Sequence, residues 1–377
     1  MKYWSVLTLL LLIISIFLII SYANIVKLLN ENRKRIVLAG SMTKKCPNNF
    51  NNENLFNKRN NSELIALKLK HNITQIIGLV FYGRKNLVKI LIRYLDLNLK
   101  INGGILDKIV FAVFTNDQED LNFIYNFTNR NSQFYESVRY NRDPRKRKTF
   151  KQLYASCQDN DIVFKIDDDI VFIKNGTFEK MLDEYLTGNH YILSANVINH
   201  SQLSYVHTRL RAILPFYEIK PYTWVIAENT TVIDDTVVFN STYSAYSKWW
   251  KEGRYAAVAH ESFFYHAYNN NLEIYNFGTW DFNSVGYHER VRINFIISWG
   301  RNLNRMVHAK AFSDETYLTI EMPKILKIHT ISLGGTLVSH LAYRLQFLYL
   351  LKTNILEKYD EFSLKYTYNS GKTYLLV

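Results

Sequence analysis

The stretch Asp161–Ile173, which reads DIVFKIDDDIVFI, decides the fold of this chain. Its first half alternates in the manner of a half-buried strand, with Ile162, Phe164 and Ile166 on one face. Three carboxylates at 167–169 follow without a break, and apolar residues resume immediately after them. The acids therefore interrupt a core element. The alternative interpretation is a solvated turn of aspartates on the surface.

The three acids predict a binding site for a cation. If the strand continues, Asp167 and Asp169 project to one side and Asp168 to the other. Two like charges about 6 Å apart repel by roughly 3 kcal/mol at an effective dielectric of about 20, so a bare site should raise a carboxylate pKa or recruit a cation. Mg²⁺ or Mn²⁺ held by one or two carboxylates keeps positions open for the phosphate oxygens of a nucleotide diphosphate.

Strand and helix patterns alternate through the first half of the chain. We expect strands over 76–82, 108–114 and 134–140, with helices around residues 87–95, 121–125 and 178–186. This order predicts an α/β protein with a mostly parallel sheet, helices on its faces and right-handed crossovers. Ligands of such sheets lie beyond the carboxyl ends of the strands. Residues 82–85, 115–117 and 167–169 should therefore meet at one edge.

Several enzyme classes are disfavoured by missing motifs. The chain lacks the G-x-G-x-x-G fingerprint, a Walker A loop and the G-x-S-x-G elbow. His260 and His266 bracket an H-E-x-x-x-x-H sequence, which differs from the H-E-x-x-H spacing of zinc proteases. Dinucleotide oxidoreductases, P-loop enzymes, α/β-hydrolases and zinc hydrolases are not predicted.

Composition and charge limit the partners. The chain has 377 residues, 48% of them hydrophobic and 15% aromatic, which excludes a mainly disordered protein. Its net charge is +13, but the basic residues are scattered apart from Arg142–Lys151 and no nucleic-acid-binding motif accompanies them, so we predict no nucleic-acid partner. Cys46 and Cys157 form no disulfide framework, and they either pair with each other or stay reduced. Seven N-glycosylation sequons are compatible with secretion.

The N-terminus carries a membrane-targeting segment. Trp4–Ala23 is uncharged and about long enough to cross a bilayer. Its length favours an uncleaved anchor, and the small residues at 21–23 allow a cleaved signal peptide, which would give a secreted form. The basic residues that follow it would place that side in the cytoplasm. A cytoplasmic position of these basic residues conflicts with the lumenal orientation that we expect for the folded part of the chain.

Residues 151–173, KQLYASCQDNDIVFKIDDDIVFI, resemble the D-x-D region of glycosyltransferases of the GT-A fold, and more narrowly of beta-1,3-galactosyltransferase-like or family 2-like enzymes. The later segments HESFFYHAYNNNLEIYNFGTWDF, ERVRINFIISWG and DETYLTIEMPK are similar to membrane-anchored relatives in fungi and protists. The resemblance spans about residues 73–360. It implies a Rossmann-like GT-A domain behind one N-terminal transmembrane helix.

The resemblance implies roles for residues in the first half. Asp169 is the expected direct metal ligand, and Asp167 lies nearer the ribose or the metal-bound waters, while the role of Asp168 beside the substrate stays open. Tyr82 and Arg84 would flank the base, and Asp117 would accept hydrogen bonds from the base or ribose. The alternative for these three residues is a role in turns. Lys148 belongs to the basic segment, which either faces the phosphates or begins a solvated helix.

The second half is expected to supply the acceptor side. Asp314 and Glu315 begin a predicted helix, so they either cap it or supply the base that deprotonates the acceptor hydroxyl, as the resemblance implies. Trp280 and Asp281 either bind a sugar or pack in the core. Residues 334–340 are expected to lead from a turn into an aromatic helix. His340 would complete the metal shell, with His329 as the competing candidate.

We therefore expect an anchor or signal-anchor at 1–23, a stem at 24–71, a nucleotide-sugar-binding half at 72–190, and an acceptor-binding and catalytic half with C-terminal helices at 191–377. The expected reaction moves a sugar from a nucleotide-sugar, most readily a UDP-sugar, to a hydroxyl of a glycan, protein or lipid, with Mn²⁺ or Mg²⁺ and inversion at the anomeric carbon. The expected location is a type II membrane protein facing the Golgi or ER lumen. The alternatives are a metal-dependent phosphotransferase or nucleotidyltransferase and a non-catalytic calcium-binding module.

Overall fold

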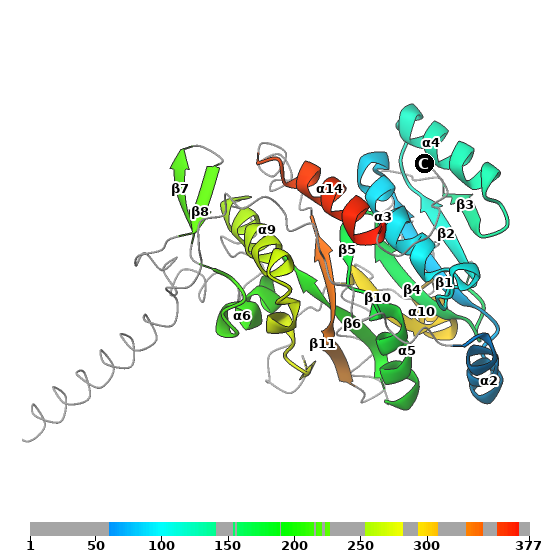
Figure 1. The fold of residues 1–377 in the computed structure, drawn as a ribbon. Coiled ribbons are helices and arrows are strands. Elements are labelled where there is room, and N and C mark those ends of the chain that lie inside the picture. The colour runs from blue at the N-terminus through cyan, green and yellow to red at the C-terminus, as the bar shows by residue number, and fades with distance from the viewer. Residues whose placement is uncertain are drawn as a thin grey trace, which may run out of the picture.

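The protein is a mixed α/β structure built on one large sheet (Figure 1). The computed structural model describes residues 60–140, 154, 157–188, 190–214, 216–220, 223–226, 253–281, 293–307, 329–341 and 353–368. Figure 1 shows α3 and α14 lying together over the sheet, with α9 on the other side of α14.

The first half contains α2 (Asn61–His71), β1 (Ile76–Tyr82), α3 (Lys85–Asn98), η1 (Lys100–Asn102), β2 (Lys108–Val113), α4 (Gln118–Arg130), β3 (Tyr135–Arg139), β4 (Ile162–Asp167), β5 (Ile170–Ile173) and α5 (Thr177–Thr187). The second half contains β6 (His190–Ile198), α6 (Ser201–Arg209), β7 (Phe216–Lys220), β8 (Thr223–Ile226), α9 (Gly253–Tyr268), η3 (Leu272–Tyr275), β9 (Thr279–Asp281), β10 (Phe295–Trp299), α10 (Gly300–Val307), β11 (His329–His340) and α14 (Ile355–Tyr368).

The sheet begins as the sequence predicts. Its order is β3-β2-β1-β4-β10-β6-β11-β5, with β9 paired to β11, and the first four strands are parallel to one another. The strands expected over residues 76–140 are confirmed within one residue at each end, and the two helices expected there are present but extend two to five residues further at each end. Helices α3 and α4 are the crossovers of this parallel part, which has the strand order that opens a doubly wound nucleotide-binding sheet.

The second half of the sheet departs from the prediction of a mostly parallel arrangement. β10 runs antiparallel to both β4 and β6, and β11 runs antiparallel to β5 and β9. The turn expected at the start of 334–340 is also wrong, because these residues belong to β11. Residues 342–352, into which the expected aromatic helix would continue, lie outside the described residues. The two glycines at 334–335 lie instead in a register shift of the ladder between β11 and β6, between Leu333 and Leu337. A β-bulge uses glycine in the same way as a turn, so the local signal was ambiguous.

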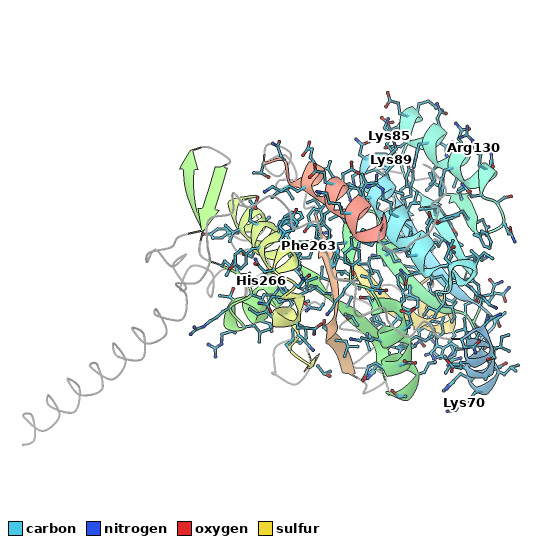
Figure 2. All side chains as sticks on the ribbon, viewed as in Figure 1. Lys70, Lys85, Lys89, Arg130, Phe263 and His266 are labelled. Atoms are coloured by element: carbon cyan, nitrogen blue, oxygen red, sulfur yellow. The ribbon has the colours of Figure 1, made fainter. Side chains whose placement is uncertain are left out.

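The sheet is buried on both faces. Ile162, Phe164 and Ile166 lie in the larger core cluster, as the alternation predicts, and Val163 lies in the smaller cluster on the other side. Helices α3, α5, α9 and α14 contribute to the larger cluster. Figure 2 shows Phe263 within this layer on α9 and basic side chains such as Lys89 at the outside of the molecule. A central strand that ends in three acids is thus surrounded by apolar packing.

None of the helices in the described ranges is long and apolar enough to cross a bilayer. Trp4–Ala23, on which the membrane prediction depends, lies outside those ranges.

Candidate functional site

The acids lie where the sheet changes direction. From β1 the chain passes to β2 on one side, whereas β4 pairs with the other side of β1. The connections that leave the carboxyl ends of β1 and β4 therefore diverge, and this kind of switch point forms a ligand crevice in open α/β sheets. Gly83 and Arg84 follow β1, and Asp168 and Asp169 follow β4. The predicted edge site is assembled here from two separate loops.

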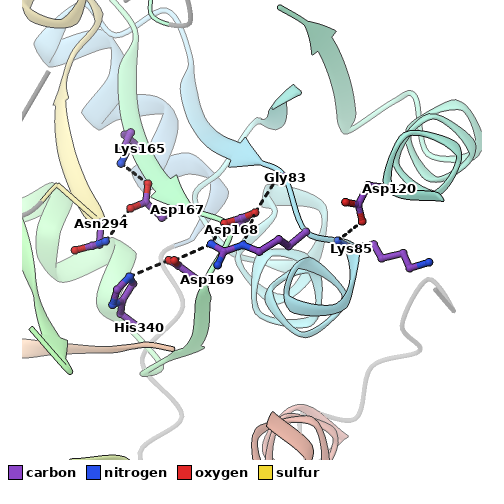
Figure 3. Close-up of polar contacts among 10 residues, drawn as sticks. Gly83, Lys85, Asp120, Lys165, Asp167, Asp168, Asp169, Asn294 and His340 are labelled. Atoms are coloured by element: carbon purple, nitrogen blue, oxygen red, sulfur yellow. Dashed lines mark hydrogen bonds and ion pairs between the residues drawn. The ribbon is translucent and has the colours of Figure 1, made fainter. Parts of the chain in front are cut away.

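Arg84 joins the two loops. Figure 3 shows Gly83 of one loop beside Asp168 of the other. The Arg84 guanidinium donates to both oxygens of Asp168, with Nε 3.2 Å from Oδ2, and its Nη2 lies 2.7 Å from Oδ2 of Asp169. The Gly83 amide also donates to Asp168 Oδ2 at 2.9 Å. β4 ends at Asp167, so the alternation of side chains expected for the three acids stops there. Asp168 and Asp169 can therefore both contact Arg84.

The position of Arg84 is unusual for a helix start. It is the N-cap residue of α3, where a positive charge opposes the helix dipole and where its side chain makes no capping bond. Asp120 of α4 supplies the missing cap, because its Oδ1 accepts from the Lys85 amide at 2.9 Å. The Asp120 carbonyl also accepts from the Tyr82 hydroxyl at 2.7 Å. The β1–α3 loop is thus held by α4 while Arg84 is directed at the acids.

Asp167 has different partners from the other two acids. Lys165, two residues earlier on the same face of β4, donates to its Oδ1 and also to the Ile293 carbonyl at 2.6 Å. Asn294 Nδ2 donates to Asp167 Oδ2 at 2.8 Å. The Lys165 side chain is only 3% exposed and the Asp167 side chain is 24% exposed. Asp167 is therefore neutralised from within the protein and keeps one face toward solvent.

His340 reaches the site from the far end of the chain. Only two residues separate β4 from β5, and β5 pairs with the last residues of β11. The end of β11 is therefore brought beside the acid turn, and the Leu341 amide donates to the Asp169 carbonyl at 2.9 Å. A register shift between Ser339 and His340 changes the alternation at this point. His340 Nε2 lies 3.2 Å from Asp169 Oδ1.

The charges of the cluster do not cancel. Burial raises the pKa of Asp168 to about 6, against the opposing effect of Arg84. Burial also raises the pKa of Asp167, although Lys165 opposes this shift. Burial alone would raise the pKa of Asp169, but His340 and Arg84 together bring it below its ordinary value. The expected rise in a carboxylate pKa is therefore seen at Asp167 and Asp168, and Arg84 and Lys165 supply positive charge beside the acids. The predicted divalent cation stays a prediction.

A divalent cation fits one part of the cluster. Asp169 Oδ1 is buried and faces His340 Nε2 at 3.2 Å, and no other group in the described part of the chain pairs with this oxygen. No group of three or more His, Cys, Asp or Glu residues suited to a metal occurs in the described parts of the chain. Two protein ligands suit Mg²⁺ or Mn²⁺ that retains water and phosphate ligands. Asp169 and His340 are therefore the fitting pair, whereas both oxygens of Asp167 already accept protein hydrogen bonds.

The remaining predicted residues divide into four groups. Tyr82 is fully buried and its hydroxyl bonds to Asp120, so in this structure its side chain offers no surface to a base. Asp117 caps α4 by accepting from the amides of residues 119 and 120, and it is exposed. Trp280 and Asp281 lie on β9, at the pairing with β11. Lys148, Asp314 and Glu315 lie outside the described residues, as does the whole basic segment Arg142–Lys151.

Sequence reasoning missed three residues that hold the site: Lys165, Asn294 and Asp120. Lys165 had a usable signal, because a lysine two positions before an aspartate on a buried strand shares its face. Asn294 and Asp120 had none, since each meets its partner only through the pairing of separate segments.

Fold and site together define a mixed α/β protein with a charged crevice at a strand switch point. No protein-family model matches the chain, and no curated protein matches it. Among solved structures, glucosyl-3-phosphoglycerate synthase from Mycobacterium tuberculosis in complex with Mn²⁺, UDP and phosphoglyceric acid is similar over 44% of this chain, at 15% identity and a TM-score of 0.26. The chain spans 59% of that structure's length.

CMP:2-keto-3-deoxy-manno-octonic acid synthetase complexed with CTP is similar over 76% of this chain and 98% of its own, at 8% identity and a TM-score of 0.36. Likeness at these levels does not establish a shared activity. A functional conclusion therefore depends on the residues of this chain.

Proposed function

We propose that this protein is a divalent-metal-dependent glycosyltransferase that moves a sugar from a nucleotide-diphosphate sugar to a hydroxyl acceptor. The observation that carries the proposal is the buried Asp169 oxygen at the crevice between β1 and β4, which among the described residues has only His340 beside it. The D-x-D resemblance of residues 167–169 agrees with this position.

Asp169 and His340 would hold the metal, which when bound acts as a Lewis acid for the departing diphosphate. Arg84 adds a positive charge at the same crevice, and its side chain is 39% exposed, so its outer face is open to a phosphate. Asp167, oriented by Lys165 and Asn294, would accept hydrogen bonds from ribose hydroxyls at its exposed edge. These contacts orient the donor, which lowers the entropic barrier to transfer.

The acceptor side of the proposal depends on residues of the second half. Asp314 or Glu315 would remove the proton of the acceptor hydroxyl, and Trp280 with Asp281 would contact a sugar. Lys148 would face the phosphates, and Asp117 the base or ribose. The N-terminal segment would anchor the enzyme as a type II membrane protein facing the ER or Golgi lumen, with UDP-sugar as donor and inversion of the anomeric carbon.

The test is a thermal-shift screen of nucleotide-sugars in the presence and absence of Mn²⁺. We expect a Mn²⁺-dependent increase in the melting temperature of the wild type, and its loss in Asp169→Asn. Glu361→Gln, an exposed carboxylate on α14, is the matched control and should respond like the wild type. A wild-type response in Asp169→Asn would contradict the assignment of the metal.

Product analysis then separates the reaction types. Release of a nucleoside diphosphate together with incorporation of the sugar into an acceptor supports the proposal. Transfer of the phosphoryl or nucleotidyl group itself would establish the phosphotransferase or nucleotidyltransferase alternative. Binding of Ca²⁺ with no Mn²⁺-dependent binding of any nucleotide-sugar would favour the non-catalytic module.

A further inference from the structure

Asn294 carries an acceptor that the protein leaves unused. The residue precedes β10, is only 6% exposed, and places its Oδ1 where no group in the described part of the chain donates to it. A buried amide oxygen without a donor is less stable than one that accepts a hydrogen bond. Such a group is retained at low cost only if something else donates to it.

The orientation of this amide is fixed by its neighbour. Asn294 Nδ2 donates to Asp167 Oδ2 at 2.8 Å, so the amide nitrogen faces Asp167. Lys165 donates to the other oxygen of the same carboxylate. The backbone is fixed too, because the Asp167 amide donates to the Asn294 carbonyl at 2.8 Å. Because the amide nitrogen of Asn294 faces Asp167, its Oδ1 points away from Asp167.

The position of Asn294 places this acceptor in the candidate site. β10 is antiparallel to β4, with Phe295 opposite Ile166, so the residue before β10 lies at the carboxyl end of β4 beside the acids. Figure 3 shows Asn294 beside Asp167, with Asp169 and His340 close by. Asp169 Oδ1 is another buried oxygen at this point, and among the described residues only His340 lies beside it.

We infer that Asn294 is a ligand-binding residue of this site, whose Oδ1 accepts a hydrogen bond from an O–H group of the bound ligand. This O–H group belongs either to a hydroxyl of the sugar being transferred or to a water on the bound cation. The inference rests on the proposed function for the identity of the ligand. Asn294 therefore has two tasks, because its nitrogen orients Asp167 and its oxygen contacts the ligand.

Asn304 on α10 supplies a matched control. Its Nδ2 donates to the Cys157 carbonyl at 2.6 Å, and its Oδ1 is likewise buried without a partner. It follows the other end of β10, where Trp299 pairs with Ile162 at the start of β4, away from the acids. The two asparagines share the chemistry and differ in location, so only Asn294 should affect ligand binding.

The experiment measures binding by titration calorimetry for wild type, Asn294→Ala and Asn304→Ala. The three probes are Mn²⁺ alone, the nucleotide-sugar with the largest response in the screen, and its free nucleoside diphosphate, the last two with Mn²⁺. We expect Asn294→Ala to weaken nucleotide-sugar binding about tenfold and Asn304→Ala to leave it unchanged. Loss for the nucleotide-sugar but not for the diphosphate identifies a sugar hydroxyl as the donor. Weaker binding of Mn²⁺ in the absence of any nucleotide identifies a metal-bound water as the donor.

Two results overturn the inference while leaving the proposed function intact. One is unchanged binding of all three probes to Asn294→Ala. The other is an equal loss for nucleotide-sugar and diphosphate with Mn²⁺ binding unchanged, which is what a purely structural role through Asp167 predicts. If Asn294→Ala does not fold, Asn294→Ser carries the same test, because its hydroxyl is too short to serve both contacts. A wild type that binds none of the probes overturns the proposed function and the inference together.

Discussion

Arg84 should stabilise the fold mainly through its ion pair with Asp168. The pair joins the β1 and β4 loops, and the Asp168 side chain is 8% exposed whereas that of Arg84 is 39% exposed. Removing one member of a buried pair costs about 3–5 kcal/mol. Because water reaches the exposed part of Arg84, we expect about 2–3 kcal/mol for Arg84→Met.

A double-mutant cycle isolates the pair. Asp168→Asn alone should cost about 1–2 kcal/mol, because Arg84 keeps Asp169 as a partner. The double variant should lose about 1–2 kcal/mol less than the sum of the single losses, because each change removes the same interaction. The measurement is the free energy of unfolding from urea denaturation near neutral pH. Losses that add to within about 0.5 kcal/mol would show that the two side chains do not interact in solution.

Cation binding gives the cycle a second readout. Arg84→Met leaves the negative charge of Asp169 with His340 as its remaining partner. Mn²⁺ should therefore raise the melting temperature of Arg84→Met more than that of the wild type. An equal Mn²⁺ effect on both proteins would place the cation away from Asp169.

Three further predictions concern the scaffold. Burial lowers the pKa of His207 to about 3, so below about pH 6.5 the unfolded chain binds a proton at this residue that the folded protein does not, and the free energy of unfolding falls as the pH drops. His207→Gln should reduce the dependence of the unfolding free energy on pH by about 1.4 kcal/mol per pH unit. The measurement is urea denaturation at a series of pH values from 6.5 downward. Phe164→Ala should cost about 3–5 kcal/mol of unfolding free energy, because the ring is fully buried in the main core, and a loss below 1 kcal/mol would contradict that packing. A Cβ on Gly300 would lie 1.9 Å from the Gln158 carbonyl oxygen, so Gly300→Ala should cost about 1–3 kcal/mol in thermal unfolding, whereas Gly335→Ala, whose nearest neighbour is 3.8 Å away, should cost less.

Local patterns predicted the first half of the fold well. The apolar run at 76–82 marks β1, and the alternation at 162–167 marks β4. The helical spacing of Leu87, Leu91, Tyr94 and Leu95 marks the buried face of α3. The same reasoning failed at β11, because two glycines signal a bulge and a turn equally well. It also missed the antiparallel placement of β10, since strand direction depends on the connection and not on the strand's own residues.

By itself the sequence determined where a buried strand ends in three acids and how strands and helices alternate around it, because backbone geometry imposes periods of two and 3.6 on neighbouring residues. Only the tertiary structure decided what each acid meets. Asp168 and Asp169 meet Arg84, Asp167 meets Lys165 and Asn294, and Asp169 meets His340. Most of these partners lie far apart in the chain, and strand order and register bring them together, which no short pattern of residues specifies.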